Sequence, residues 1–273
     1  MTDRYAVMGN PIAHSKSPQI HGLFARQTGQ DIGYEKILVA LDGFAAAVAE
    51  FQRLGGKGLN VTVPFKQEAW ALMGGLSERA RAAGAVNTIV LEADGRLFGD
   101  NTDGTGLVHD LRDNHGVQLT DRRVLLLGAG GAARGVIPAL LDEIPAAITI
   151  ANRTGARAQE LAELFGARGA LHGCGLDALG GRFDIVINAT SAGLSGELPA
   201  LAPDLLADGA VCYDMVYGDG PTAFQQWAQR HGARLALDGL GMLVEQAAAA
   251  FQLWRGIRPD TAPVIAALRQ RSQ

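Results

Sequence analysis

One segment of the sequence, residues 124–134, constrains what the whole chain can fold into. It holds the apolar run Val124-Leu125-Leu126-Leu127, a glycine-rich turn and the start of a helix-compatible stretch that reaches Leu141, with Pro138 as the one reservation. The apolar run is short enough for a strand that is covered on both faces, as in a parallel sheet. A strand, a turn and a helix in this order predict an α/β fold.

The turn has the spacing Gly128-x-Gly130-x-x-Ala133. Backbone N–H groups and the positive end of the helix dipole would face a phosphate there, and glycine lets the phosphate approach closely. A tight turn without a ligand can have the same spacing, but the strand before it and the helix after it favour dinucleotide binding. The residues expected to contact the cofactor in this turn are Gly128, Ala129, Gly130, Gly131 and Ala132.

Length and composition limit the number of domains, the class of ligand and the location that we expect. A chain of 273 residues favours two domains, and we expect the active site in the cleft between them. A net charge of −4 offers no basic surface for nucleic acid, and the start of the chain has no signal-peptide pattern. Because the apolar stretch after Val124 carries Arg134, no transmembrane helix is indicated. We expect a cytoplasmic protein with small-molecule ligands.

Cysteine and histidine give no sign of a metal site. Cys174 and Cys212 lie in no C-x-x-C pattern, and the six histidines have no ligand spacing. Two reduced, structural thiols are therefore expected, and no metal.

The first part of the chain alternates strands, near residues 5–9, 34–39 and 59–63, with helices near 19–27 and 44–54, which predicts a mostly parallel sheet. The loop after the first strand contains Ser15 and Ser17. As structure, Ser17 is an N-cap and Pro18 the first helical residue. As chemistry, two hydroxyls at a helix N-terminus can bind a carboxylate. The loop alone favours the structural interpretation.

Polar residues mark the third strand. Asn60 and Thr62 share one face of it, and asparagine is disfavoured in strands, so this face is expected to line a cleft. Pro64 ends the strand and places Lys66 in the first turn of a helix, where a cation opposes the helix dipole. Such local violations often mark function, although a surface lysine in water is the alternative.

Two further strands, at residues 85–90 and 96–99, are expected to form a hairpin that leads into a helix over residues 104–114. Asp103 precedes that helix. Taken alone, it is better explained as a helix cap than as a catalytic group.

Five segments together resemble the shikimate dehydrogenase family in order and spacing, over essentially the whole chain: Asn10-Pro11, Ser15-Lys16-Ser17-Pro18, Asn60 to Lys66, Gly84 to Thr88 and Gly99 to Gly104. The resemblance implies NADPH-dependent reduction of 3-dehydroshikimate to shikimate, on the route to chorismate and the aromatic amino acids. It also implies that Ser15 and Ser17 hold the substrate carboxylate, and that ring hydroxyls are contacted by Asn60, Thr62, Asn87 and Asp103. Lys66 and Asp103 are the implied catalytic pair.

The pair also makes chemical sense on its own. Hydride transfer to a carbonyl leaves an alkoxide that needs a proton, so an acid/base group must touch the reacting oxygen. We assign Lys66 as that group and Asp103 as its partner. Which of the two carries the transferred proton stays open.

The expected second strand of the cofactor domain, residues 147–151, is followed by Asn152-Arg153-Thr154-Gly155-Ala156-Arg157, with no acid before Glu160. An NAD site usually has an acid here. Arg153 and Arg157 instead are spaced to converge on one phosphate, with Asn152 and Thr154 as neutral donors, which favours NADP. Two solvated arginines are the alternative. The family uses an N-R-T-x-x-R motif in this way.

The remaining site residues follow later strands. Thr190 and Asn188 alternate out of an expected third cofactor-domain strand at residues 183–193, and Met215 and Tyr217 follow a strand at 210–213. A long helix from Asp238 to about Trp254 is expected to return to the first domain. The resemblance implies that Met215, Gly239 and Met242 lie near the nicotinamide, and that Tyr217 and Gln246 reach the substrate; a core methionine, a half-buried tyrosine and a capped helix explain the same residues without function.

We therefore expect a substrate-binding and catalytic domain of residues 1–103 completed by 238–273, and a Rossmann-type, doubly wound NADP-binding domain of residues 104–237. A quinate/shikimate dehydrogenase would favour an acid after the second cofactor strand, and often threonine in place of Ser17. A non-catalytic NADP sensor would not need Lys66 and Asp103, and an S-adenosylmethionine methyltransferase would again favour the acid. Sequence does not distinguish a monomer from a homodimer.

Overall fold

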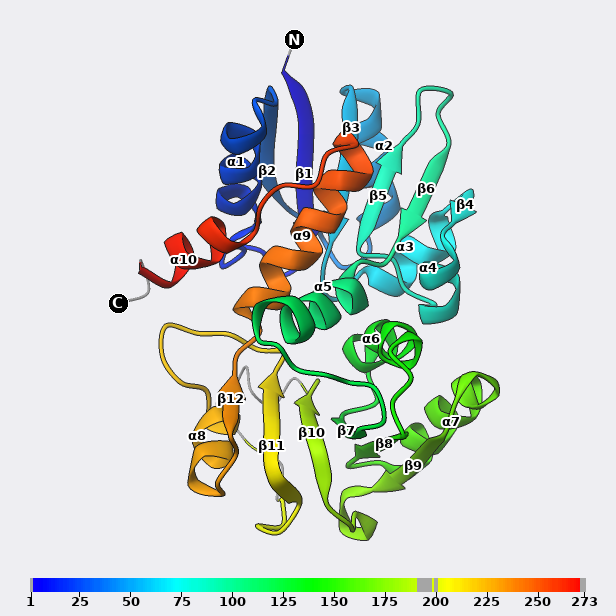
Figure 1. The fold of residues 1–273 in the computed structure, drawn as a ribbon. Helices are drawn as coiled ribbons and strands as arrows, with labels where there is room; N and C mark the ends of the chain where they lie inside the picture. Colours follow the sequence, from blue (N-terminus) through cyan, green and yellow to red (C-terminus); the bar gives the residue numbers. More distant parts are fainter. Residues whose placement is uncertain (1, 191–197, 199–200, 271–273) are drawn as a thin grey trace. The chain divides into compact units, whose positions relative to one another are not determined.

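The computed structural model describes residues 2–190, 198 and 201–270. The chain forms two compact units, each built around a six-stranded sheet (Figure 1). Unit 1 comprises residues 1–106 and 244–267, and unit 2 comprises residues 107–243 and 268–273. The α/β fold expected from the sequence is confirmed. Within the described ranges, no helix has the length and apolar character needed to cross a membrane.

The sheet of unit 1 has the strand order β2-β1-β3-β5-β6-β4. Its strands are β1 Asp3–Gly9, β2 Ile32–Leu38, β3 Gly56–Val61, β4 Gly75–Leu76, β5 Thr88–Leu91 and β6 Leu97–Asp100. β1 runs parallel to β2 and β3, whereas β5 is antiparallel to both β3 and β6. The helices are α1 Ser17–Thr28, α2 Phe44–Arg53, α3 Lys66–Leu72, α4 Glu78–Ala83 and α5 Asp103–His109. The sheet is therefore mixed, with a parallel part and the expected hairpin.

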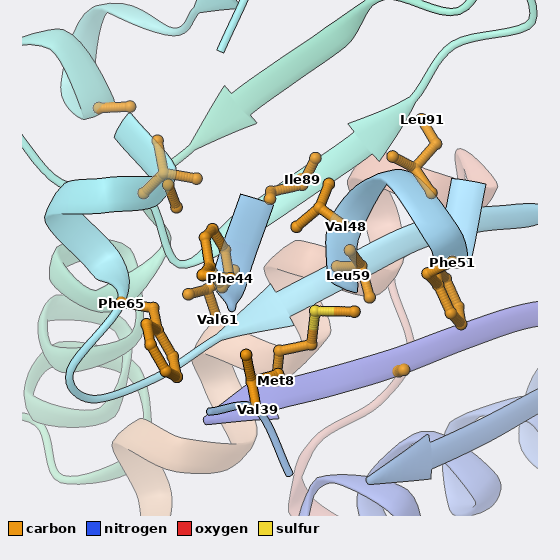
Figure 2. Packing of buried hydrophobic residues seen from close by; sticks show 14 residues of the cluster. Met8, Val39, Phe44, Val48, Phe51, Leu59, Val61, Phe65, Ile89 and Leu91 are labelled. Carbon is orange, nitrogen blue, oxygen red and sulfur yellow. The ribbon is translucent and has the colours of Figure 1, made fainter. Parts of the chain in front are cut away.

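A buried apolar cluster joins α2 to β1, β3 and β5 (Figure 2). Phe44 of α2 stacks on Phe65, with ring centroids 5.1 Å apart and planes at 12°. Phe65 is 1% exposed and directly precedes Lys66. Because burial of the Phe65 ring fixes the backbone where α3 begins, the apolar core also determines where the Lys66 side chain starts.

The C-terminal half of α9 (Leu240–Arg255) packs on the sheet of unit 1. Its Trp254 indole lies where a side chain on Gly58 would be, donates from Nε1 to the carbonyl of Ile89 at 3.0 Å and lies 4.7 Å from the ring of Tyr5. Glycine at position 58 in β3 is thus explained by close approach of this ring. The next helix, α10, spans Ala262–Gln270.

Unit 2 contains a fully parallel sheet with the order β12-β11-β10-β7-β8-β9. The strands are β7 Arg123–Leu127, β8 Ala147–Asn152, β9 Leu171–Gly175, β10 Phe183–Asn188, β11 Leu206–Asp214 and β12 Leu235–Leu237, and the helices are α6 Gly131–Asp142, α7 Gly155–Phe165 and α8 Ala223–Arg230. This is the doubly wound order of dinucleotide-binding sheets, in which ligands bind at the carboxyl ends of the strands where the order reverses. Here that point lies between β7 and β10.

Two details differ from expectation, and the helix expected to continue through Pro138 is confirmed. β9 was not expected, so the strand at residue 183 is the fourth of this unit and not the third. Gly173 in β9 explains the omission: glycine is rare in strands, but a Cβ here would collide with the backbone of Ala158 in α7. The helix expected over residues 104–114 is α5 followed by a π-helical turn, Asp110–Asn114. Pro138 lies inside α6. Residues 191–193 of the expected strand are outside the described residues.

Candidate active site

Ser15 and Ser17 lie together at the start of α1. The Ser15 hydroxyl donates to the Ser17 hydroxyl at 3.1 Å, and the backbone N–H of Ser17 donates to Ser15 Oγ at 3.3 Å. The expectation that Ser17 caps α1 is wrong, because Lys16 is the N-cap and Ser17 is the first helical residue. The two hydroxyls therefore bond to each other, and it is Ser15, not Ser17, that accepts from a backbone N–H of the first turn.

Asn60 and Thr62 follow one another on the polar side of β3 and its continuation. Asn60 is 6% exposed and its amide donates to the carbonyl of Asn87 at 3.3 Å and to Thr88 Oγ1 at 3.2 Å. Thr62 lies one residue beyond β3, which ends at Val61. Its side chain is half-buried, and its methyl group fills the space that a Cβ on Gly9 would need.

Lys66 and Asp103 form an ion pair. Lys66 is the first residue of α3 and Asp103 the first residue of α5. Lys66 Nζ lies 2.5 Å from Asp103 Oδ2, and the two side chains are 23% and 10% exposed. The second carboxylate oxygen, Oδ1, accepts from Asn87 Nδ2 at 2.7 Å. Both oxygens of Asp103 are thus held by side chains, so its position is explained by this pair and not by capping of α5.

Asn87 is the centre of a buried polar network. Its amide nitrogen, which has two hydrogens to share, also lies 3.0 Å from Thr102 Oγ1 and 3.4 Å from Gln246 Oε1, and its amide oxygen accepts from the backbone of Thr102 at 2.9 Å. Asn87 is 2% exposed. With every polar atom satisfied, the amide holds the Asp103 carboxylate in one orientation. The structure therefore brings Lys66, Asn87, Asp103 and Gln246 together in unit 1.

In unit 2, the glycine turn has the conformation that a phosphate site needs. Gly128 has φ +102°, which favours glycine, and a Cβ there would also crowd the carbonyl of Ala189. Gly130 is the N-cap of α6 and contributes no side-chain cap. Gly130, Gly131 and Ala132 are exposed, with open space around the two glycines, whereas Ala129 is half-buried. The first N–H groups of α6 are therefore accessible to an anion.

The segment after β8 carries the two arginines on the surface. Arg153 and Arg157 are both exposed, and neither guanidinium group forms a hydrogen bond or an ion pair with another described residue. Thr154 is the N-cap of α7, and Asn152 Nδ2 donates to the Thr154 carbonyl at 3.0 Å. The guanidinium groups are thus available for a ligand.

Thr190 is held by a buried network at the ends of β10 and β11. Its hydroxyl donates to Asn188 Oδ1 at 2.7 Å, and Asn188 Nδ2 donates to Asp214 Oδ1 at 3.0 Å. Burial raises the pKa of Asp214, although hydrogen bonds from Thr222, Val216 and Asn188 oppose the shift. The alternation of Asn188 and Thr190 out of an apolar strand already indicated a crevice at this strand end, whereas Asp214 was not among the expected site residues. Its position as a polar residue at the end of an apolar strand was the available signal.

Met215, Gly239 and Met242 also lie in unit 2. Gly239 packs against the backbone of Met215, and the N–H of Met242 donates to the Tyr213 hydroxyl at 3.3 Å. Tyr217 is half-buried, and burial raises the pKa of its hydroxyl. Tyr217 belongs to unit 2, whereas the other expected substrate residues belong to unit 1.

No metal site emerges from the described residues, among which no group of three or more His, Cys, Asp or Glu side chains could hold an ion.

Comparisons with known proteins agree along the chain. A family model described as the shikimate dehydrogenase substrate binding domain matches residues 7–89, a shikimate / quinate 5-dehydrogenase model matches 110–195, and a shikimate 5'-dehydrogenase C-terminal domain model matches 239–269. A protein of Alkalilimnicola ehrlichii named shikimate dehydrogenase (NADP(+)) is 66% identical over 98% of this chain and 99% of its own length.

Solved structures give the same result. An Ael1 enzyme from Pseudomonas putida is 50% identical, with a TM-score of 0.91 over 98% of both chains. Shikimate 5-dehydrogenase from Thermus thermophilus, solved in complex with NADP(H) and shikimate, is 33% identical, with a TM-score of 0.86 over 100% of both chains.

A doubly wound sheet with an accessible glycine turn, and a separate α/β unit with a Lys-Asp pair, define a two-unit, dinucleotide-dependent oxidoreductase. The comparisons specify this class further. The chain belongs to the shikimate dehydrogenase family.

Proposed function

We propose that this protein is an NADP-dependent shikimate dehydrogenase, which interconverts 3-dehydroshikimate and shikimate in aromatic amino acid biosynthesis. The observation that carries this proposal is the pair formed by Lys66 and Asp103, 2.5 Å apart and fixed by Asn87. An acid/base pair on a rigid network is what reduction of a carbonyl to an alcohol requires beyond the cofactor. The family relationship supports the identity of the substrate.

We assign substrate binding and catalysis to unit 1. The Ser15 and Ser17 hydroxyls would turn from each other towards the substrate carboxylate, and Asn60, Thr62, Asn87 and Asp103 would contact ring hydroxyls. Gln246, whose amide oxygen already faces Asn87, would contact the same substrate. Tyr217 of unit 2 would contact the carboxylate.

In the reduction, Lys66 would donate a proton to the oxygen that receives negative charge as hydride arrives, and in the oxidation it would accept that proton. Asp103 would orient Lys66 and hold the reacting hydroxyl. The hydride comes from the nicotinamide of NADPH when the cofactor is bound. Every other step is assigned to side chains of unit 1.

We assign cofactor binding to unit 2. Gly128, Ala129, Gly130, Gly131 and Ala132 would receive the pyrophosphate, and Asn152, Arg153, Thr154 and Arg157 would receive the 2′-phosphate, because both guanidinium groups are exposed and lack a partner among the described residues. Thr190, Met215, Gly239 and Met242 would contact the nicotinamide side. Residues 238–273 were expected to complete the substrate-binding domain, but they are divided between the two units.

The described thiols support a cytoplasmic location. Cys174 and Cys212 are unpaired, which is the usual state in a reducing compartment.

The test measures absorbance of the reduced nicotinamide with purified protein, crossing shikimate and quinate against NADP and NAD. We expect turnover with shikimate and NADP, and its loss by about a thousandfold or more in Lys66→Ala with NADP binding unchanged, as for removal of an acid/base group. Lys57→Ala, an exposed lysine of the same sheet, is the matched control. Faster turnover with quinate or NAD would overturn the specificity, and no turnover with any pair would favour the NADP sensor.

A further inference from the structure

Tyr34, on β2 of unit 1, connects two groups of proposed substrate residues. Its hydroxyl donates to Asn60 Oδ1 at 2.7 Å. On its other side lies Ser17, whose side chain acts to lower the Tyr34 pKa and accepts from Ser15 at 3.1 Å. The Tyr34 hydroxyl therefore neighbours the two serines while it bonds to Asn60.

The ring of Tyr34 is held by aromatic packing. His21 stacks on it with ring centroids 4.3 Å apart and planes at 7°. Burial lowers the pKa of His21 to about 3, although the Asn60 side chain opposes this shift, and neither ring nitrogen has a well-oriented hydrogen-bond partner among the described residues. His21 is thus a neutral packing group. Burial likewise raises the pKa of Tyr34, against the effect of Ser17, so its hydroxyl stays a donor.

The neighbours of Asn60 determine what its amide can offer a ligand. Both amide hydrogens are committed, one to the carbonyl of Asn87 and one to Thr88 Oγ1. Thr88 cannot reverse this bond, because its own hydroxyl hydrogen is donated to Asn87 Oδ1 at 2.9 Å. Asn60 Oδ1 accepts from Tyr34 and keeps one further acceptor position.

We propose that Tyr34 is a positioning residue for the substrate, which holds Asn60 so that the remaining acceptor position of Oδ1 receives a hydrogen bond from a substrate hydroxyl. The inference rests on the proposed function. Asn60 then requires a hydroxyl donor at the ring position it faces. Loss of the Tyr34 hydroxyl leaves a buried amide oxygen without its donor and frees the Asn60 side chain to rotate.

The two ends of the substrate site respond differently to loss of this hydroxyl. Ser17 has one hydroxyl hydrogen, which cannot be donated to Tyr34 and to a carboxylate at the same time. Carboxylate binding at Ser17 therefore does not need Tyr34 as an acceptor, whereas hydroxyl binding at Asn60 depends on Tyr34. Recognition of a ring carboxylate without hydroxyls should not need Tyr34.

The experiment compares Tyr34→Phe with wild type, using shikimate as substrate and cyclohex-1-ene-1-carboxylate, which lacks the ring hydroxyls, as competitive inhibitor. We expect the KM for shikimate to rise about 5- to 50-fold, as when a buried acceptor loses its donor. We expect kcat and the KM for NADP to stay within about twofold, and the inhibition constant of the carboxylate to be unchanged or lower. Tyr5→Phe is the matched control, because Tyr5 is buried in the same sheet and its hydroxyl contacts Arg255 instead.

A second variant keeps the test independent of how Tyr34→Phe folds. Asn60→Ala should raise the KM for shikimate without weakening the carboxylate inhibitor, and adding Tyr34→Phe to it should change KM by less than about twofold, because coupled residues are not additive. An unchanged KM in Tyr34→Phe, equal losses for substrate and inhibitor, or additive effects in the double variant would each overturn the role of Tyr34 while leaving the proposed function standing. Absence of turnover and of shikimate binding in the wild type would overturn both.

Discussion

The carbonyl of Met215 occupies the space that a Cβ atom on Gly239 would need. The contact is reinforced by the N–H of Gly239, which donates to the carbonyl of Val216 at 3.1 Å. Gly239 directly precedes α9, and Met215 directly follows β11. Two segments of unit 2 that we assign to the nicotinamide are thus in backbone contact because position 239 has no side chain.

Gly239→Ala should therefore separate these segments. Because the neighbouring atoms are backbone and cannot rotate away, we expect a lower melting temperature and a KM for NADP raised about tenfold or more. Thermal unfolding and steady-state kinetics measure both. Gly180→Ala, at a position with open space and no positive φ, should change neither. A Gly239→Ala protein with wild-type NADP kinetics would contradict this assignment.

Substitution of the exposed arginines should change the choice of cofactor. We expect Arg153→Ala and Arg157→Ala each to raise the KM for NADP about 10- to 100-fold, the loss of one charge-assisted hydrogen bond to a phosphate, and to leave the KM for NAD unchanged. Arg168→Ala is the control, since Arg168 is paired with Asp142 at 2.7 Å near the end of α7. If NAD and NADP are weakened equally, the arginines do not bind the 2′-phosphate.

The ion pair between Arg79 and Asp100 should contribute to the stability of unit 1. Asp100 is 3% exposed; its burial acts to raise the carboxyl pKa, but the Arg79, Ser77 and Asn101 hydrogen bonds and the Arg79 charge outweigh it, so the net pKa is lowered. Arg79→Ala should reduce the free energy of unfolding near pH 7 by about 1–3 kcal/mol, a range that allows for the partial exposure of Arg79.

The sign of the pH effect follows from the lowered pKa of Asp100. Its contribution is present above the unfolded-state pKa and is lost as pH falls through the folded-state value. The free energies of unfolding of wild type and Arg79→Ala, measured with urea, should therefore become more similar as the pH is lowered. Arg96→Ala removes an exposed arginine that contacts only exposed acids and should have no measurable effect. A difference that grows in acid would be inconsistent with this pair.

His21 should make the protein less stable in acid. Its folded-state pKa is about 3, below the unfolded value, so between these values only the unfolded chain takes up the proton. Stability should fall there by up to about 1.4 kcal/mol per pH unit from this group. His21→Phe, which keeps an aromatic ring, should show a shallower loss of unfolding free energy from about pH 6 to pH 4. Parallel curves for the two proteins would show that His21 titrates normally.

Local patterns predicted the parts of the fold that local chemistry determines. The strand expected from the apolar run that ends at Leu127 is β7. The glycine-rich turn follows it, and α6 begins directly after Gly130. Pro64 correctly indicated that the strand ends and that Lys66 lies in the first turn of a helix, although α3 begins at Lys66 itself. In each case a short apolar run or a glycine or proline defines the element, without help from distant residues.

Distant contacts decided what local patterns could not predict. The strand β9 can pack against α7 because Gly173 has no Cβ, whereas the propensity of glycine alone argues for a loop. Ser17 is the first residue of α1 and not its cap, and its hydroxyl accepts from Ser15. No sequence pattern indicated a role for Tyr34, because that role depends on Ser17 and Asn60, which belong to other elements.

The accessible start of α6 has a consequence for how the protein is kept folded. A serine or aspartate at position 130 would stabilise the isolated helix, but its side chain would stand where we place the pyrophosphate. The turn therefore leaves the first N–H groups of α6 without a side-chain partner, and we assign the cofactor to that place. On this assignment NADP binding stabilises unit 2, so its resistance to heat and proteases should rise with the NADP concentration.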